Sequence, residues 1–281
     1  MRNNQDRLGM GAPTDNIQPG HEPPPTPSVT QFIVPTELVE LPSKGLFYDE
    51  GHPLHGRETV EIKHMTTKEE DILTNQSFVK NGSAVDKLLQ SVLVDPPRVN
   101  VKDMLIGDKN ALTVACRIFG YGAQYETKFR CPACGVTQQH MFDLAEIEHS
   151  NFNDSLEEFD AEIDYDKKMV TLPIPRNDTK LELRILTDDS TNTSRKNKKG
   201  NKFSIIKQYE KMIYSVNGNS DRVYVKNYIT SMSALDSRYL RAAYSKVIPG
   251  VDFSCSFDCE SCGHEDNVEV PLTAEFFWPK S

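Results

Sequence analysis

Cys131-Pro132-Ala133-Cys134-Gly135 and Cys259-Glu260-Ser261-Cys262-Gly263 are the two stretches that decide the expected fold. In each, two cysteines stand three positions apart and a glycine follows directly. This spacing lets both thiolates of a tight turn point at one centre, and glycine allows backbone N–H groups to turn toward the sulfurs. Four sulfurs make the closed tetrahedral set that zinc favours in structural sites. The spacing therefore predicts a structural Zn²⁺ held by Cys131, Cys134, Cys259 and Cys262.

Strand-like segments flank both cysteine turns. Residues 125–130 and 136–144 surround the first turn, and residues 251–257 and 268–272 surround the second, with partly alternating apolar positions. A strand, a cysteine turn and a second strand, twice over, are typical of a zinc ribbon. However, the 124 residues 135–258 separate the two turns. If one metal joins them, the ribbon is split, and the chain between its halves is an insertion in a single domain.

Other interpretations of the cysteines stay open at this stage. Two redox C-x-x-C sites would be expected at strand-to-helix junctions, where neither turn lies. Two disulfides would need an oxidising compartment, and a pair of turns that has lost its metal is a further alternative. Cys255 could be a spare ligand, although its alternating strand favours packing, and the apolar pattern around Cys116 favours the core. His140 and His264 lie near the turns and could replace a ligand, but four cysteines already complete the set.

Composition narrows the class of protein. The chain has 281 residues, a formal charge of −9 and a pI of about 5.3, which argues against a general nucleic-acid binder. No stretch approaches the roughly 18 apolar residues of a membrane span, and no signal peptide is visible, so we expect a cytoplasmic protein without membrane contacts. The phosphate-binding, dinucleotide-binding, zinc-protease and serine-hydrolase motifs are absent. Four cysteines on one zinc also leave no open position for a water, so we expect no enzymatic activity.

The remaining chain predicts an α+β fold in one zinc-joined domain, residues 36–281, after a disordered proline-rich tail, residues 1–35. A helical layer comes first: Thr66 and Glu69 form a capping box for a helix that runs to Gly82, and Asp108 caps a third helix. Between them, apolar residues recur at helical spacing in a core-facing stripe: Val85, Leu88, Leu89, Val92 and Leu93.

Residues 145–250 form the predicted inserted α/β segment. Strands are expected at 159–163, 169–174 and 180–186, and Ser233 is expected to cap a helix. Residues 223–232 fit either a helix or a strand. The basic stretch 195–202 is interpreted as a solvated loop, with phosphate or an acidic partner as the alternative. The aromatic residues 276–278 are expected to seal the core or to dock on a partner.

Several of these stretches together resemble one protein family. They are the Leu41-Pro42-Ser43-Lys44-Gly45 turn, the helix start at 65–73, the 85–89 stripe, Gly107-Asp108-Lys109-Asn110-Ala111, the two cysteine turns and Phe276-Phe277-Trp278-Pro279. The combination is similar to the baseplate hub or hub-assembly proteins of T4-like contractile-tailed bacteriophages. The similarity covers roughly residues 36–144 and 250–281.

This resemblance implies a structural or chaperone-like role in building the centre of the tail baseplate. The implied partners are other baseplate hub proteins or tape-measure proteins. The implied location is the host cytoplasm during assembly, or the baseplate of the virion tail. The alternative function is a zinc-ribbon nucleic-acid-binding factor, for which the basic stretch 195–202 would supply phosphate contacts.

Overall fold

The structure, a computed structural model, describes residues 33–150, 152–187, 204–271 and 276–277. It contains both helices and sheets, which confirms the α+β class. The helices are α1 (Thr67–Thr74), α2 (Gln76–Lys80), α3 (Ala84–Val92), α4 (Ile106–Tyr121), α5 (Phe152–Glu158), α7 (Ile205–Met212), α8 (Arg222–Ser231) and α9 (Ala234–Val247), with 3₁₀ turns at Val101–Asp103 and Leu144–Glu146. The strands are β1 (Thr36–Glu40), β2 (Thr59–Lys63), β3 (Leu93–Asp95), β4 (Gln124–Arg130), β5 (Thr137–Asp143), β6 (Glu148–His149), β7 (Glu162–Asp164), β8 (Met169–Ile174), β9 (Thr179–Arg184), β10 (Ile213–Val216), β11 (Val251–Asp252), β12 (Ser254–Asp258) and β13 (Glu265–Glu269). None of the helices in these ranges is long and apolar enough to cross a membrane.

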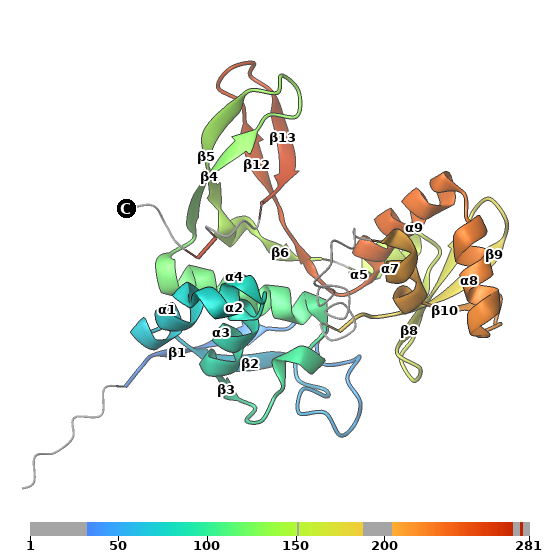
Figure 1. The fold of residues 1–281 in the computed structure, drawn as a ribbon, viewed down its shortest axis with the longest axis horizontal. Coiled ribbons are helices and arrows are strands. Elements are labelled where there is room, and N and C mark those ends of the chain that lie inside the picture. Colours follow the sequence, from blue (N-terminus) through green and yellow to red (C-terminus); the bar gives the residue numbers. More distant parts are fainter. Residues whose placement is uncertain (1–32, 151, 188–203, 272–275, 278–281) are drawn as a thin grey trace, which may run out of the picture. The chain divides into compact units, whose positions relative to one another are not determined.

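The first described part of the chain forms a small antiparallel sheet that is covered by helices. Its strands pair in the order β1-β2-β3, and α3 and α4 lie on one face (Figure 1). Val60 and Ile62 point from the central strand into the core between the layers. Leu88, Leu89 and Val92 of α3 are completely buried in the same core, as predicted for the apolar stripe, whereas Val85 is half-buried and Leu93 belongs to β3.

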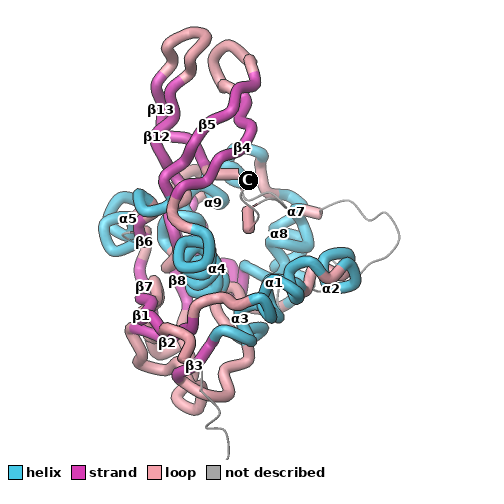
Figure 2. The backbone as a smooth tube through the Cα atoms, turned by 90° about the vertical axis from the view of Figure 1, so that its left-hand side faces the viewer, coloured by secondary structure: helices cyan, strands magenta, loops and turns pink. Residues whose placement is uncertain are grey.

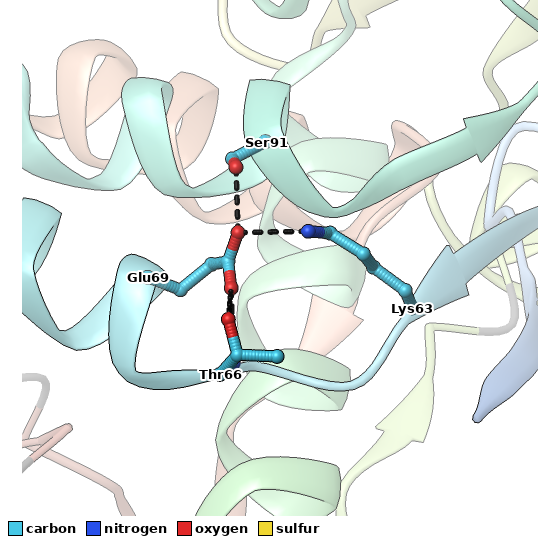
Figure 3. Close-up of polar contacts among 4 residues, drawn as sticks. All are labelled: Lys63, Thr66, Glu69 and Ser91. Carbon is cyan, nitrogen blue, oxygen red and sulfur yellow. Dashed lines mark hydrogen bonds and ion pairs between the residues drawn. The ribbon is translucent and has the colours of Figure 1, made fainter. Parts of the chain in front are cut away.

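Helix α1 begins where the capping pattern predicts. The Glu69 carboxylate accepts hydrogen bonds from the Thr66 N–H at 2.9 Å and from the Thr66 hydroxyl at 2.5 Å. It also accepts from Lys63 Nζ at 2.9 Å and from Ser91 Oγ at 2.6 Å (Figure 3). One buried carboxylate therefore joins the start of α1 to the end of β2 and to α3.

The helix expected to continue to Gly82 is in fact two helices, so that prediction is wrong. Asn75 has an extended backbone, and its side-chain oxygen accepts hydrogen bonds from the N–H groups of Ser77 and Phe78. Asparagine favours this role because its short side chain competes with the helical backbone for N–H groups. Helix α2 therefore starts anew at Gln76, and its Val79 side chain is 49% exposed.

The prediction that Asp108 caps the third helix is also wrong. Helix α4 begins at Ile106, and Asp108 is fully buried within its first turn. The Asp108 carboxylate accepts hydrogen bonds from the N–H and the hydroxyl of Ser43, at 2.9 and 2.6 Å, and from the Tyr48 hydroxyl at 2.7 Å. Burial raises the pKa of Asp108, and these hydrogen bonds act against that rise. Asp108 thus holds the turn around Ser43 against α4.

A second hydrophobic cluster draws its buried members from residues 161–247, and the partly buried Ile106 of α4 also packs against it. Its antiparallel sheet has the strand order β10-β9-β8-β7, and α7, α8 and α9 pack on these strands. The strands expected at 169–174 and 180–186 are found as β8 and β9, whereas the strand expected at 159–163 lies later, as β7. The ambiguous residues 223–232 form α8. Ser233 caps α9 as predicted, since its hydroxyl accepts a hydrogen bond from the Asp236 N–H at 3.1 Å.

The first hydrophobic cluster combines residues 39–144 with residues 255–277. Arg117 of α4 is fully buried, and its guanidinium donates to the carbonyls of Gly122 and Gln124 at 2.5 and 2.8 Å. It also donates to the Phe276 carbonyl at 2.7 Å, which links the two parts of the cluster. A cation is favourable at this place because the carbonyls at a helix C-terminus carry partial negative charge. Phe276 and Phe277 are buried, so both belong to the core as expected.

Three features of the sequence interpretation lie outside the described residues. They are the proline-rich tail as far as residue 32, the basic stretch 195–202, and Trp278 of the aromatic end.

Candidate metal centre

Two β-hairpins carry the cysteine turns. Strands β4 and β5 pair from Gln124↔Asp143 to Arg130↔Thr137, and β12 and β13 pair from Ser254↔Glu269 to Asp258↔Glu265. The hairpins lie side by side, with β5 next to β12, in both views of the molecule (Figures 1 and 2). Each cysteine turn therefore sits at the tip of a hairpin, and the two tips meet although they are distant in the sequence.

The two cysteine turns have the same backbone hydrogen bonds. The Cys131 N–H donates to the Val136 carbonyl at 2.9 Å, and the Gly135 N–H donates to the Cys131 carbonyl at 3.0 Å. The equivalent bonds in the second turn are Cys259 N–H to His264 and Gly263 N–H to Cys259, at 2.9 and 2.8 Å.

Both turns also close through a glycine in the left-handed region, which side chains other than glycine's rarely adopt. The φ angles are 75° at Gly135 and 65° at Gly263. The glycine after each C-x-x-C therefore has the geometric role that the sequence pattern predicts.

The structure brings all four predicted cysteines together. Their Sγ atoms lie within 4.8 Å of one another. The two distances between hairpins are 3.9 Å for Cys131 to Cys262 and 3.7 Å for Cys134 to Cys259. A tetrahedral centre with Zn–S bonds of about 2.3 Å sets any two sulfurs about 3.8 Å apart. The donor set and its spacing therefore fit one tetrahedral Zn²⁺.

These distances do not fit disulfides. Bonded sulfurs lie about 2.05 Å apart, and all six cysteines of the chain are free. Within the cluster, Cys131 and Cys259 are buried, whereas Cys134 and Cys262 are exposed. Each hairpin thus contributes one inner and one outer sulfur, and each inner sulfur lies next to the outer sulfur of the other hairpin.

Two of the four thiols, Cys131 and Cys262, differ in how readily they lose a proton. The Cys134 N–H, 3.5 Å from Cys131 Sγ, is the main reason why the pKa of Cys131 is lowered to about 6. The His264 N–H acts in the same direction on Cys262, but desolvation and the neighbouring sulfurs raise the pKa of Cys262 to about 12. The Cys131 thiolate therefore forms easily and the Cys262 thiolate forms with difficulty. A bound divalent cation would favour all four thiolates and would release protons on binding.

Two polar side chains also join the hairpins: Gln138, which the sequence interpretation missed, and His140, which it considered only as a replacement ligand. Gln138 of β5 donates to the Asp258 carbonyl at 2.8 Å and accepts from the Glu260 N–H at 3.1 Å, so its amide bridges to β12 as a backbone peptide would. His140 Nε2 lies 3.1 Å from the Ser256 carbonyl. Both occupy polar positions of an alternating strand, where the sequence carries no signal that would separate them from solvated residues.

The other candidate ligands lie outside the cluster. Cys255 is buried, and its thiol lies 3.6 Å from the Asp143 carbonyl. Cys116 is buried in α4. The His140 ring packs edge-on against Phe142 and near Phe257, and His264 pairs with Asp266. Cys255 and Cys116 are therefore packed in the interior, as their sequence patterns predicted.

Most of the chain matches a family model whose description is T4 bacteriophage base plate protein. The match covers residues 36–278 and includes both cysteine turns and both hydrophobic clusters. No curated protein and no solved structure shows significant similarity to the chain.

Proposed function

Because the chain belongs to the T4 bacteriophage base plate protein family, we propose that it is a structural or chaperone-like assembly protein of the baseplate hub of a contractile tail. The family match over residues 36–278 is the observation that carries this proposal. Membership implies association with the virion tail and with other baseplate components. The proposed partners within that set are hub or tape-measure proteins, which the protein would meet in the host cytoplasm during assembly.

The proposal includes one structural zinc, held by Cys131, Cys134, Cys259 and Cys262. The nearly tetrahedral spacing of their sulfurs supports it. When bound, the metal would supply a crosslink between the two hairpin tips. A closed set of four thiolates has no position for a reacting water, so this zinc would stabilise the fold without taking part in catalysis.

We also propose that residues 36–281 form one domain into which residues 145–250 are inserted. The distribution of core residues supports this arrangement. The first hydrophobic cluster draws its fully buried members from residues 39–144 and 255–277, whereas the second draws its own from residues 161–247. The zinc site would close the first cluster across the insertion.

The negative charge of the hairpin formed by β12 and β13 argues against nucleic acid as the partner. Its acidic side chains are exposed around the cysteine turn: Asp258, Glu260, Glu265, Asp266 and Glu269. Phosphate recognition needs cationic side chains at the contact, and these carboxylates would repel the backbone of DNA or RNA. A gel shift at low salt should therefore show no binding to either nucleic acid.

The hub role is tested by affinity capture from infected cells. The tagged full-length chain should recover hub or tape-measure proteins, identified by mass spectrometry. Recovery of proteins from the baseplate periphery alone would contradict the hub proposal, whereas recovery of no baseplate protein would contradict an assembly role altogether.

The zinc site is tested separately by metal analysis of the purified protein. The native chain should hold one zinc, and the double variant Cys134→Ser, Cys262→Ser should hold none and should unfold at a lower temperature. Cys255→Ala is the matched control, because Cys255 lies in the same hairpin but outside the cluster. Zinc retained by the double variant, or absent from the native chain, would overturn this part of the proposal.

A further inference from the structure

Strand β1 is an edge strand with a free side. The hydrogen bonds from the His64 N–H to the Pro35 carbonyl, at 2.9 Å, and from the Leu41 N–H to the Glu58 carbonyl, at 2.7 Å, show which positions face β2. In an antiparallel ladder, alternate residues direct their backbone groups to opposite sides. The backbone groups of Thr36, Leu38 and Glu40 therefore face away from β2. Over the described ranges, no backbone hydrogen bond reaches them from another strand.

The centre of this free edge is apolar. Leu38 is 69% exposed, whereas Val39 beside it points into the core. Unpaired strand edges are templates for further strands, and proteins usually protect them with charge, proline or a covering element. An exposed leucine at the middle of the edge favours pairing instead.

We propose that β1 pairs in antiparallel fashion with β1 of a second copy of this chain, about a twofold axis at Leu38. This register places Leu38 opposite Leu38 and Thr36 opposite Glu40 on both sides of the axis. All the outward N–H and C=O groups of the strand then find partners. The two three-stranded sheets become one continuous sheet.

The sequence of β1 is complementary to itself in this register. No carboxylate lies opposite another carboxylate, and each Thr36 hydroxyl can donate to the Glu40 carboxylate opposite. A twofold axis at Glu40 would instead place two carboxylates face to face, which destabilises a strand pair. An intermediate register would pair Thr36 with Pro42, which has no N–H to donate. The register at Leu38 is therefore the one that uses the whole edge.

A strand edge of this length buries less surface than the roughly 1,200 Å² of a standard interface. We therefore expect a weak dimer that forms with increasing protein concentration. This inference concerns the sheet edge alone, and it rests neither on the zinc site nor on the hub role.

Cysteine crosslinking of the full-length chain tests the register. In Leu38→Cys, the two new cysteines would lie directly opposite each other, with Cα atoms about 5.5 Å apart, a separation that a disulfide can bridge. In Glu40→Cys, the same strand carries an exposed cysteine, but the Cα atoms of its two copies would be about 14 Å apart. A mild thiol oxidant should therefore link Leu38→Cys into dimers and leave Glu40→Cys unlinked. Both variants keep the native cysteines, so any crosslink through those cysteines would form equally in both. Equal yields of dimer would therefore refute the register.

Sedimentation of the unmodified chain tests the dimer itself. The native protein should show a concentration-dependent dimer, and Leu38→Pro should be monomeric, because proline removes the N–H at the axis. That N–H faces away from β2, so circular dichroism should show the same fold. A native chain that stays monomeric, or a dimer that persists in Leu38→Pro, would overturn the proposal. If the Leu38 amide were protected from hydrogen exchange only when another baseplate protein is present, the strand edge would bind that protein. This result would also overturn the proposed dimer.

Discussion

Glu69→Gln is the substitution that most directly tests how the helical layer is held to the sheet. The Glu69 side chain is fully buried and accepts hydrogen bonds from Lys63, Thr66 and Ser91 (Figure 3). Burial acts to raise the pKa of this carboxyl, but the bonds from Ser91, Thr66 and Lys63 outweigh it and lower the pKa from 4.5 to about 2. Glutamine keeps the shape of the side chain, removes its charge, and points an NH₂ group at neighbours that all donate to the native carboxylate.

The pKa of Glu69 sets the size of the effect. A fall from 4.5 to about 2 corresponds to about 3.4 kcal/mol of folding stability, at about 1.36 kcal/mol for each pKa unit. Because the folded-state pKa lies below the unfolded one, this stability is fully present above pH 4.5 and is lost as the pH falls toward 2. At pH 3 about 1.4 kcal/mol should remain.

The assay is urea unfolding of the native chain and the variant between pH 7 and pH 3. The difference in unfolding free energy should be about 3 kcal/mol at pH 7 and should shrink as the native carboxyl becomes protonated. Glu70→Gln is the matched control, since Glu70 is the next residue, is exposed and loses the same charge. It should cost about 0.5 kcal/mol or less. A difference for Glu69→Gln that does not change with pH, or that equals the control, would refute the reasoning.

Two further substitutions test how separate parts of the chain meet. A Cβ added at Gly107 would lie 2.2 Å from the Pro249 carbonyl oxygen. Gly107→Ala should therefore lower the unfolding free energy by about 1–3 kcal/mol, measured by thermal unfolding. Gly51→Ala is the control and should be nearly neutral, because a Cβ at Gly51 would meet open space. Equal melting temperatures for the two variants would contradict the close approach. Gln138→Ala should cost about 1 kcal/mol and should leave the zinc stoichiometry unchanged, because it removes only the amide bridge to β12, and exposed Gln139→Ala is its control. An effect no larger than that of Gln139→Ala would show that the bridge contributes nothing to hairpin docking.

Local sequence rules predicted the features that depend on neighbouring residues. The starts of α1 and α9 could be predicted because the capping hydrogen bonds join residues only three positions apart: Thr66 with Glu69, and Ser233 with Asp236. The hairpins follow from alternating segments on both sides of a cysteine turn. The proximity of the two turns followed from chemistry, because four cysteines in two C-x-x-C turns suit one metal across any sequence distance. The break at Asn75 was within reach of the same rules, since asparagine is a strong N-cap.

Long-range polar contacts could not be predicted in this way. An aspartate near a helix start is usually a cap, and nothing in the residues around Asp108 shows that Ser43, 65 positions earlier, is its partner. Likewise, the sequence does not distinguish Gln138, which bridges to β12, from Gln139 beside it, which is exposed. Such contacts depend on the arrangement of whole elements, and only the folded structure brings their partners together.

The stretches that carry the resemblance turn out to be joined to one another inside the fold. Ser43 of the first turn binds Asp108, and Lys109 beside Asp108 pairs with Asp86. Glu69 binds Ser91, which follows the 85–89 stripe in α3. Residues with such buried roles define a scaffold and leave its contact surfaces unspecified. The family pattern therefore accounts for how the helical layer is held together. What distinguishes this chain in an assembly must come from surfaces that the pattern leaves free, such as the acidic face of β12 and β13 and the open edge of β1.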